Sequence, residues 1–327
     1  MMNSGFALII GRAACLATML ACVMSVAVAA DSPVQEGAQK AVLVTGASSG
    51  IGRQVTELLA SEGYFVYAGA RKQEDLDALN ALDNVQAVRL DVTRPDEIEA
   101  AVETVRKGQR GLYGLVNNAG VFTGGPLIET DIGELQWIFD VNVFGIYRVT
   151  QAFAPMIIES KGRIVNISSI SGILDWPLGG LYTMSKHAVE AYNDTLALEL
   201  ARFGVGVSAI EPGNFRSDIS KSARARLAKQ GVQAESTRYA DEWAGFADSP
   251  ADRSQYKEPE AVAAAIAHAL FDPNPKPRYM VVPNQEEAGW TIGEAMKELV
   301  ELNQNQPYSY SREQLVEMLD AAMGGAD

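Results

Sequence analysis

Cysteine is nearly absent from the sequence. The two cysteines, Cys15 and Cys22, both lie within the first 30 residues, so the rest of the chain contains none. This excludes disulfides, cysteine nucleophiles and thiolate metal sites after residue 30. Histidine is almost as scarce. We interpret His187 and His268 as packed or solvated helix positions, and the sequence predicts no metal site.

Positive charge is also in short supply. The 327 residues include 27 Lys and Arg against 41 Asp and Glu, which gives a formal net charge of −14. This balance argues against binding to nucleic acid or docking on an anionic lipid surface. The length suits one large domain or two small ones.

The N-terminal segment has the pattern of a targeting sequence. Arg12 precedes an apolar run over 13–30 that ends in small residues and then turns polar. This pattern predicts a secretory signal cut after Ala29 or Ala30. The alternatives are an uncut membrane anchor, since the run is about long enough to span a bilayer, and a misassigned start at Met24 or later. We therefore expect export or anchoring by this segment, and a cytoplasmic protein if the start is misassigned.

Strand and helix patterns alternate from residue 41 onward. Short apolar runs predict about seven strands, and apolar residues at helical spacing predict helices between them. The strands are expected at 41–44, 64–68, 85–90, 112–116, 162–167, 205–210 and 278–282. The helices are expected after Gly52, at 73–82, from Pro95, and at 131–159, 182–203 and 258–271. The alternation predicts an α/β fold, a Rossmann-like doubly wound parallel sheet that binds ligands beyond the carboxyl ends of its strands.

Two segments fall outside the alternation. Residues 214–257 are long, polar and unperiodic, and we interpret them as a lid with a short helix and a solvated basic patch at 221–226. Residues 286–327 are expected to form two amphipathic helices that cover either the substrate mouth or an oligomer interface. The predicted organisation is a leader (1–30), a catalytic domain (31–285) and a C-terminal helical extension. We also expect a homo-oligomer.

A glycine-rich turn follows the first predicted strand. It reads Thr45-Gly46-Ala47-Ser48-Ser49-Gly50-Ile51-Gly52, and a helix pattern comes directly after it. Such a turn lets a pyrophosphate approach backbone N–H groups and the positive end of the helix.

Tyr182 and Lys186 are four residues apart at the start of a predicted helix, so they share one face. A fixed cation favours a phenolate, and we therefore expect Lys186 to lower the pKa of Tyr182 from its ordinary ~10. Such a tyrosine can exchange a proton with a carbonyl or alcohol oxygen. Ser169 follows the strand over 162–167, where its hydroxyl could hold the same oxygen. Taken alone, Tyr182 and Lys186 also fit an ordinary surface helix pair.

Together, these motifs resemble those of the short-chain dehydrogenase/reductase family, in its compact single-domain branch. The resemblance covers about residues 40–283. It rests on the glycine turn, Asn117-Asn118-Ala119-Gly120, Asn142, Ser169, Tyr182-x-x-x-Lys186 and Pro212-Gly213.

The resemblance implies a role for each matching residue. Tyr182 would be the general acid/base, Lys186 would lower its pKa and bind the nicotinamide ribose, and Ser169 would orient the reacting group. Asn142 would support a water-linked proton path to Lys186. Ser168 has a similar hydroxyl, but strand neighbours point to opposite faces, and the spacing to Tyr182 in similar proteins favours Ser169. The implied cofactor contacts are Gly46, Ser48, Ser49, Gly50, Ile51, Gly52, Asp91, Val92, Asn118, Ala119, Gly120, Pro212, Gly213 and Ser217, besides Tyr182 and Lys186.

The end of the second predicted strand bears on cofactor choice. A carboxylate there would bind a ribose 2′-OH and repel a 2′-phosphate. This chain instead has Ala70 followed by Arg71 and Lys72, and an arginine can grip a phosphate with two parallel hydrogen bonds. We therefore predict NADP(H), with NAD(H) as the alternative. Arg71 would otherwise form a surface salt bridge, and Ser49 stands where similar NADP-binding proteins often carry a basic residue.

The predicted substrate is apolar. Leu174, Trp176, Leu178, Leu181 and Phe215 are expected to line its pocket, which suits a hydrophobic ketone, aldehyde or secondary alcohol. The sequence thus predicts an oxidoreductase that transfers a hydride between nicotinamide and such a substrate.

Two other functions stay open at this point. One is a catalytically silent NADP(H)-binding sensor or scaffold, which the complete set of Asn142, Ser169, Tyr182 and Lys186 argues against. The other is an epimerase or dehydratase acting on a sugar nucleotide, which the glycine spacing and the length argue against.

Overall fold

Seven parallel strands form the sheet, which confirms the predicted fold class. The computed structural model describes residues 39–230, 237–248 and 253–324. The order of the strands across the sheet is β3-β2-β1-β4-β5-β6-β7. The strands are β1 (Ala41–Val44), β2 (Phe65–Ala70), β3 (Val85–Arg89), β4 (Gly114–Asn117), β5 (Arg163–Ile167), β6 (Gly206–Pro212) and β7 (Arg278–Val281).

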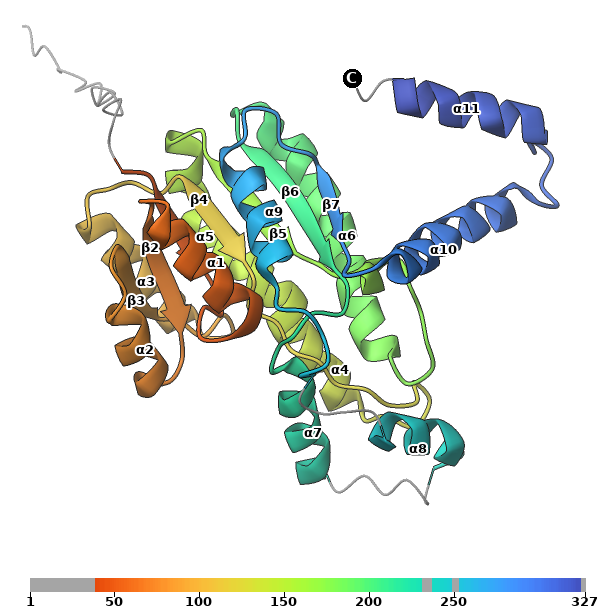
Figure 1. Cartoon of the computed structure of the whole chain (residues 1–327), viewed down its shortest axis with the longest axis horizontal. Helices are drawn as coiled ribbons and strands as arrows, with labels where there is room; N and C mark the ends of the chain where they lie inside the picture. The colour runs from red at the N-terminus through yellow and green to blue at the C-terminus, as the bar shows by residue number, and fades with distance from the viewer. Residues whose placement is uncertain (1–38, 231–236, 249–252, 325–327) are drawn as a thin grey trace, which may run out of the picture. The chain divides into compact units, whose positions relative to one another are not determined.

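Helices connect the strands and follow the last one (Figure 1). Two short turns of other types, η1 (Asp140–Phe144, π-helical) and η2 (Ile170–Gly172, 3-10), lie among them. The α-helices are α1 (Gly50–Ser61), α2 (Gln73–Asn80), α3 (Pro95–Lys107), α4 (Ile132–Phe139), α5 (Gly145–Glu159), α6 (Gly180–Ala201), α7 (Ile219–Gln230), α8 (Ala240–Asp248), α9 (Glu260–Phe271), α10 (Gln285–Asn303) and α11 (Arg312–Gly324).

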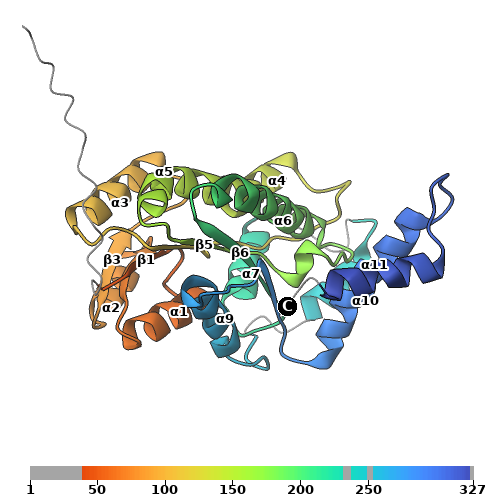
Figure 2. The same cartoon turned by 90° about the horizontal axis from the view of Figure 1, so that it is seen from above.

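Helices cover both faces of the sheet. Figure 2 shows α3, α5 and α6 on one face and α1, α2 and α9 on the other. Alternate residues of β1 serve the two sides: Val42 and Val44 belong to the core under α1 and α9, whereas Leu43 belongs to the core under α3 and α5. This alternation is the strand period of two, and a strand covered on both faces is buried along its length.

The strand order reverses between β1 and β4. The chain runs from β1 outward to β2 and β3, and then returns to add β4 on the opposite side of β1. The connections after β1 and β4 therefore leave in opposite directions, which opens a crevice at the carboxyl ends of these strands. Ligand sites of doubly wound sheets lie in such crevices.

One predicted helix is interrupted. The expected helix over 131–159 is α4, the π-helical turn η1, and then α5. In η1, the side-chain amide of Asn142 donates to Val121 O at 2.9 Å and to the Ser185 hydroxyl at 3.1 Å. Turns of this type inside helices occur frequently at functional sites. These partners are distant in the sequence, so the local pattern does not reveal the turn.

The predicted lid over 214–257 contains two helices, α7 and α8, where one short helix was expected. Leu178, in the loop before α6, packs with Leu227 of α7 and Trp243 of α8. This small apolar cluster fixes the described part of the lid to the body of the domain.

The interpretation of the basic patch as a solvated face is wrong for Arg226. Its guanidinium donates to both carboxylate oxygens of Glu134, at 2.7 and 2.8 Å, and lies 3.5 Å from the centroid of the Trp137 ring. Both partners belong to α4, so the contact ties the lid to that helix.

The described residues include one helical stretch, 132–159, that is long and apolar enough to cross a membrane by length and composition. In this fold it packs against the sheet through Val149, Phe153 and Ile157, which are fully buried. The predicted signal segment, 1–30, lies outside the described residues.

The C-terminal extension forms the two predicted helices, α10 and α11. Helix α10 begins against the end of β6, where the buried carboxylate of Glu287 accepts a hydrogen bond from Asn214 N at 2.8 Å. Thr291, one turn later, is also buried. The first half of α10 is therefore part of the domain wall.

Candidate active site

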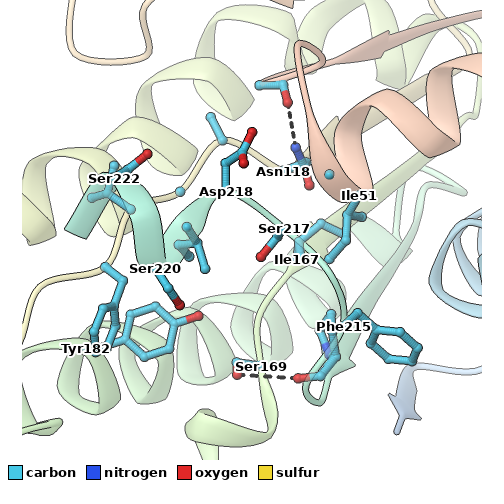
Figure 3. Close-up of a pocket in the computed structure, with 18 of the residues that line it drawn as sticks. Ile51, Asn118, Ile167, Ser169, Tyr182, Phe215, Ser217, Asp218, Ser220 and Ser222 are labelled. Carbon is cyan, nitrogen blue, oxygen red and sulfur yellow. Dashed lines mark hydrogen bonds between the residues drawn. The ribbon is translucent and has the colours of Figure 1, made fainter. Parts of the chain in front are cut away.

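A cavity of about 830 Å³ lies at the carboxyl ends of the strands, next to the crevice between β1 and β4 (Figure 3). Its wall includes most of the residues singled out in the sequence. They are Gly46, Ser48, Ser49, Gly50, Ile51, Arg71, Asp91, Val92, Asn118, Ala119, Gly120, Ser169, Tyr182, Lys186, Pro212, Gly213 and Ser217. Gly52 and Asn142 do not belong to this wall.

The glycine turn between β1 and α1 forms one side of the cavity. Gly46 and Gly50 have φ values of +65° and +53°, a conformation that side chains strongly disfavour. A Cβ at Gly52 would lie 2.2 Å from Gly46 O, so this position has no room for a side chain. The turn is therefore folded tightly on itself, with the N-terminal end of α1 beside the cavity.

Asn118 holds this turn in place. Its side-chain amide donates to Thr45 O at 2.9 Å and to Gly46 O at 3.0 Å. Its backbone N–H donates to the Thr45 hydroxyl, also at 2.9 Å. The end of β4 is thus joined to the turn after β1, which fixes the width of the crevice between them.

Tyr182 stands in the first turn of α6, with its ring edge-on to Phe122 at a centroid distance of 5.2 Å. The Ser169 hydroxyl lies close enough to the Tyr182 phenol to favour its ionised form, while it donates to the Ser171 hydroxyl at 3.0 Å and faces Pro212 O at 3.4 Å. The Ser169 oxygen also accepts from Ser171 N at 3.1 Å. Ser168, the other candidate, has a buried hydroxyl that makes no hydrogen bond within the described part of the chain. The structure thus brings Ser169 to the phenol.

The expectation that Lys186 lowers the pKa of Tyr182 is wrong. Burial raises the pKa of Tyr182 to about 12, against the opposing effects of the nearby Ser169 hydroxyl and the positive charge of Arg253. The Lys186 ammonium lies 5.6 Å from the centroid of the Tyr182 ring and donates to Ile167 O at 2.9 Å. Burial also lowers the pKa of Lys186 to about 8, with Glu190 acting in the opposite direction. For each group, the effect of burial on the pKa is larger than the opposing effect of the neighbouring groups.

Asn142 lies behind the wall and is completely buried. Both of its amide hydrogens are used, as described for η1, and its Oδ1 accepts from Val121 N at 2.8 Å. The side chain therefore joins the loop after β4 to α6 one residue before Lys186. In this structure its contacts are those of a positioning residue.

Comparison with known proteins gives the family of the chain. A family model described as short chain dehydrogenase matches residues 40–228, which is more than half of the chain. The chain belongs to the short-chain dehydrogenase family. The resemblance inferred from the motifs is thereby confirmed.

Individual members of the family show how far the similarity extends. The chain is 39% identical over 199 residues to the mitochondrial D-beta-hydroxybutyrate dehydrogenase of Rattus norvegicus, covering 58% of each chain. It is 35% identical over 253 residues to the NADPH-dependent 3-dehydrocapnine reductase of Ornithobacterium rhinotracheale, covering 74% of this chain and 88% of the reductase. The chain therefore spans little more than half the length of the first relative.

A solved structure matches over a larger share. The short-chain dehydrogenase/reductase from Burkholderia phymatum in complex with NAD is 29% identical, with a TM-score of 0.68, over 84% of this chain and 98% of that one. The relatives are named dehydrogenases and reductases, and nicotinamide-dependent oxidoreductases are the class predicted from the sequence. One name carries NADPH and the other structure carries NAD, so the family does not decide between the two cofactors.

Arg71 and Asp91 face each other on the part of the cavity wall that was predicted to contact the cofactor. Their closest charged atoms are 3.8 Å apart, and the Arg71 side chain is 67% exposed. Asp91 turns its other oxygen to Thr93, accepting from the backbone N–H at 2.9 Å and from the hydroxyl at 2.7 Å. An exposed pair at this distance is weak, so Arg71 is free to reach another anion.

Two predicted substrate contacts are wrong. Leu178 is buried in the lid cluster, and Leu181 is buried at the start of α6, so neither belongs to the cavity wall. The other three predicted contacts, Leu174, Trp176 and Phe215, do line the cavity.

The sequence did not single out Arg253, Tyr256 and Trp290, which all line the cavity. Arg253 and Tyr256 follow the lid helices in a polar segment without periodicity. Trp290 comes from α10, in the extension whose role the sequence left open between substrate mouth and oligomer interface. In the sequence, the only feature that pointed to a contact with the cavity was the aromatic residue Trp290 itself, near the start of the extension.

Proposed function

We propose that the protein is an NADP(H)-preferring oxidoreductase that interconverts a hydrophobic ketone or aldehyde and the corresponding alcohol. Tyr182 acts as the general acid/base. The observation that carries this proposal is the placement of the Ser169 hydroxyl, the part-buried Tyr182 phenol and the glycine turn on the wall of one cavity. The family membership supports the reaction class.

The glycine turn fits a dinucleotide. Gly46 and Gly50 adopt left-handed conformations, and a Cβ at Gly46 would lie 2.9 Å from Ala119 Cα, so backbone forms the surface of the cradle. Backbone N–H groups and the N-terminal end of α1 favour a pyrophosphate at this place. Residues 46–51 would hold it, with Asp91 and Val92 toward the adenine and Pro212 and Gly213 toward the nicotinamide. When bound, the nicotinamide supplies or accepts the hydride.

The phenol of Tyr182 supplies the proton during carbonyl reduction. Its high pKa keeps the phenol protonated at neutral pH, which is the form that a proton donor needs. Ser169 would hold the carbonyl oxygen beside the phenol, and Lys186 would bind the nicotinamide ribose. Oxidation of an alcohol needs the phenolate instead, and Ser169 and Arg253 are the groups that favour that form. Asn142 positions Lys186 and the loop after β4.

The preference for NADP(H) rests on Arg71. Its exposed guanidinium lies at the end of β2 and on the cavity wall, with only a weak partner in Asp91. A 2′-phosphate would give this guanidinium a stronger, charge-assisted interaction. NAD(H) remains the alternative.

Several apolar side chains lie on the substrate side of the cavity. Phe122, Leu174, Trp176, Phe215 and Trp290 contribute to it. Such a lining binds an apolar substrate body and leaves the polar Ser169–Tyr182 pair to select the carbonyl group.

The proposal is tested by following reduced nicotinamide absorbance with the purified protein. NADPH and NADH would be compared across ketones, aldehydes, quinones and steroids, with Tyr182→Phe as the matched variant. The expected result is turnover with NADPH that is lost in Tyr182→Phe, while the NADPH dissociation constant changes by less than about tenfold. NADPH binding without turnover on the whole panel would favour the silent sensor over the enzyme.

A further inference from the structure

Arg253 is a half-buried cation on the cavity wall. The two other arginines of this wall have carboxylate partners, Arg71 with Asp91 and Arg216 with Glu258 at 2.5 Å. Within residues 39–230, 237–248 and 253–324, no carboxylate lies within 4.0 Å of the Arg253 guanidinium. A partly buried charge is costly without a partner, so the position calls for a counter-charge.

The guanidinium is held by one edge. Its Nε donates to Phe215 O at 3.0 Å and its Nη2 donates to Asn214 Oδ1 at 2.8 Å. The ring of Tyr256 lies against it, 4.5 Å from the guanidinium carbon to the ring centroid. A guanidinium has five N–H donors, and these two bonds leave three, on Nη1 and Nη2. That remaining edge can bind a carboxylate with two parallel hydrogen bonds.

The position of Arg253 connects it to the reacting group. Its two hydrogen-bond partners directly follow Pro212 and Gly213, the predicted nicotinamide contacts. Its charge acts on the Tyr182 phenol, so the two side chains are within electrostatic range across one cavity.

The other charged groups near this region are Lys186 and Glu287 and, elsewhere on the cavity wall, the carboxylates of Asp175 and Asp218. Lys186 adds a second positive charge, although its ammonium is bound to Ile167 O. Glu287 is the negative group that acts on Arg253. The Glu287 carboxylate is buried and accepts a hydrogen bond from Asn214 N. Glu287 therefore contacts the same loop that binds the Arg253 guanidinium.

We propose that Arg253 binds a carboxylate of the substrate, so that the preferred substrates are oxo acids, or the matching hydroxy acids, with an apolar chain. This inference rests on the proposed function and narrows its substrate class. The apolar lining takes the chain, Ser169 and Tyr182 take the carbonyl oxygen, and the free edge of Arg253 takes the acid group.

The test compares acids with their own esters. A series of oxo fatty acids, with the carbonyl moved along the chain, is reduced with NADPH beside the methyl ester of each. Wild-type protein is expected to have a higher kcat/KM for at least one acid than for its ester. Arg253→Gln is expected to lose about tenfold to a hundredfold in kcat/KM for that acid, mainly through KM. Its kcat/KM for the ester, which has no acid group, should fall much less, so that the acid-to-ester ratio drops about tenfold or more.

Two further variants sharpen this result. Arg253→Lys keeps the charge but loses the planar fork, so its acid-to-ester ratio should fall between those of wild type and Arg253→Gln. Arg216→Gln removes the paired arginine of the same wall and should leave the ratio within about twofold of wild type. Equal losses for acid and ester in Arg253→Gln would mean that Arg253 acts only through Tyr182 or the lid and does not bind the acid group, and this would overturn the proposal.

A binding measurement separates this inference from the proposed function. Octanoate, with octanol as the neutral probe, is added to the NADPH-loaded protein, and the midpoint of thermal unfolding is followed. Octanoate should stabilise wild type and Arg216→Gln but not Arg253→Gln, whether or not any carbonyl is turned over. Equal shifts in wild type and Arg253→Gln, or no shift in either, would count against a carboxylate site.

Discussion

The Lys186 ammonium reaches from α6 to the end of β5, where it donates to Ile167 O at 2.9 Å. This bond is made inside the protein, since only 5% of Lys186 is exposed. A single backbone carbonyl does not replace the hydration of an ammonium, which is why burial lowers the pKa of Lys186 to about 8. Lys186, which was predicted to lower the pKa of Tyr182, thus has a strongly lowered pKa itself.

Replacing Lys186 by Met should therefore remove a pH-dependent contribution to the free energy of unfolding. The pKa of Lys186 is lowered from its ordinary 10.5 on folding, so between about pH 8 and 10.5 the unfolded chain binds a proton that the folded protein does not. The free energy of unfolding of wild type should rise over this window relative to Lys186→Met, by about 1 to 2 kcal/mol from pH 8 to about pH 9.5. Urea unfolding at several pH values measures it. A difference between the two proteins that stays constant with pH would contradict the assignment.

Ser169→Ala should impair the reaction at the proton-transfer step. The Ser169 hydroxyl favours the ionised form of Tyr182, so its removal should raise the pKa of Tyr182 above its present value of about 12. We expect kcat/KM for alcohol oxidation to fall about 100-fold or more and to need a higher pH than in wild type. The measurement is a pH profile of kcat/KM. Ser168→Ala is the matched control, because the Ser168 hydroxyl has no described partner; an equal loss there would argue against the role of Ser169.

Arg71→Asp should reverse the proposed preference for the phosphorylated cofactor. The new carboxylate would repel a 2′-phosphate and accept a hydrogen bond from a 2′-OH, so the NADPH dissociation constant should rise about tenfold to a hundredfold while that of NADH holds or improves. Fluorescence titration of both cofactors measures it. Lys72→Asp is the control, because Lys72 pairs with Glu74 at 3.4 Å and does not line the cavity. Equal weakening for both cofactors in Arg71→Asp would remove the basis for NADP(H).

Much of this fold could be predicted because its strands are covered on both faces. Val42, Leu43 and Val44 read as an apolar run, and each is fully buried. The glycine turn could be predicted for a similar local reason: the conformations at Gly46 and Gly50 are ones that glycine alone adopts readily.

What the sequence did not reveal depends on partners that are distant in the chain. The π-helical turn at Asn142 exists through contacts with Val121 and Ser185. The position of Arg253 depends on Asn214 and Phe215, nearly forty residues earlier. The pKa of Tyr182 was predicted in the wrong direction because helical spacing shows which charge is near, whereas the cost of burial depends on the whole fold.

The last prediction concerns Glu211, whose carboxylate is buried beside Arg278. It is 1% exposed on β6, and it shares the guanidinium of Arg278 with Glu190 and Asp194, at distances of 2.5, 2.8 and 3.1 Å. One cation faces three carboxylates. Burial, followed by repulsion from Glu190, raises the pKa of Glu211 to about 7.

The consequence for stability has a definite sign. The folded pKa of Glu211 lies above the ordinary 4.5, so between about pH 4.5 and 7 the folded protein holds a proton that the unfolded chain has released. The stability from this group is complete below that window and is lost as pH rises through about 7. Glu211→Gln mimics the protonated form, so the variant should keep this stability as the pH rises. Relative to wild type, the variant should therefore gain on the order of 2 kcal/mol in unfolding free energy between pH 5 and pH 8. Asp194→Asn, at a side chain that is 58% exposed, is the control and should follow wild type. If wild type and Glu211→Gln changed in parallel over this range, the buried carboxyl would have to be ionised throughout, with Arg278 shared more evenly than its contacts indicate.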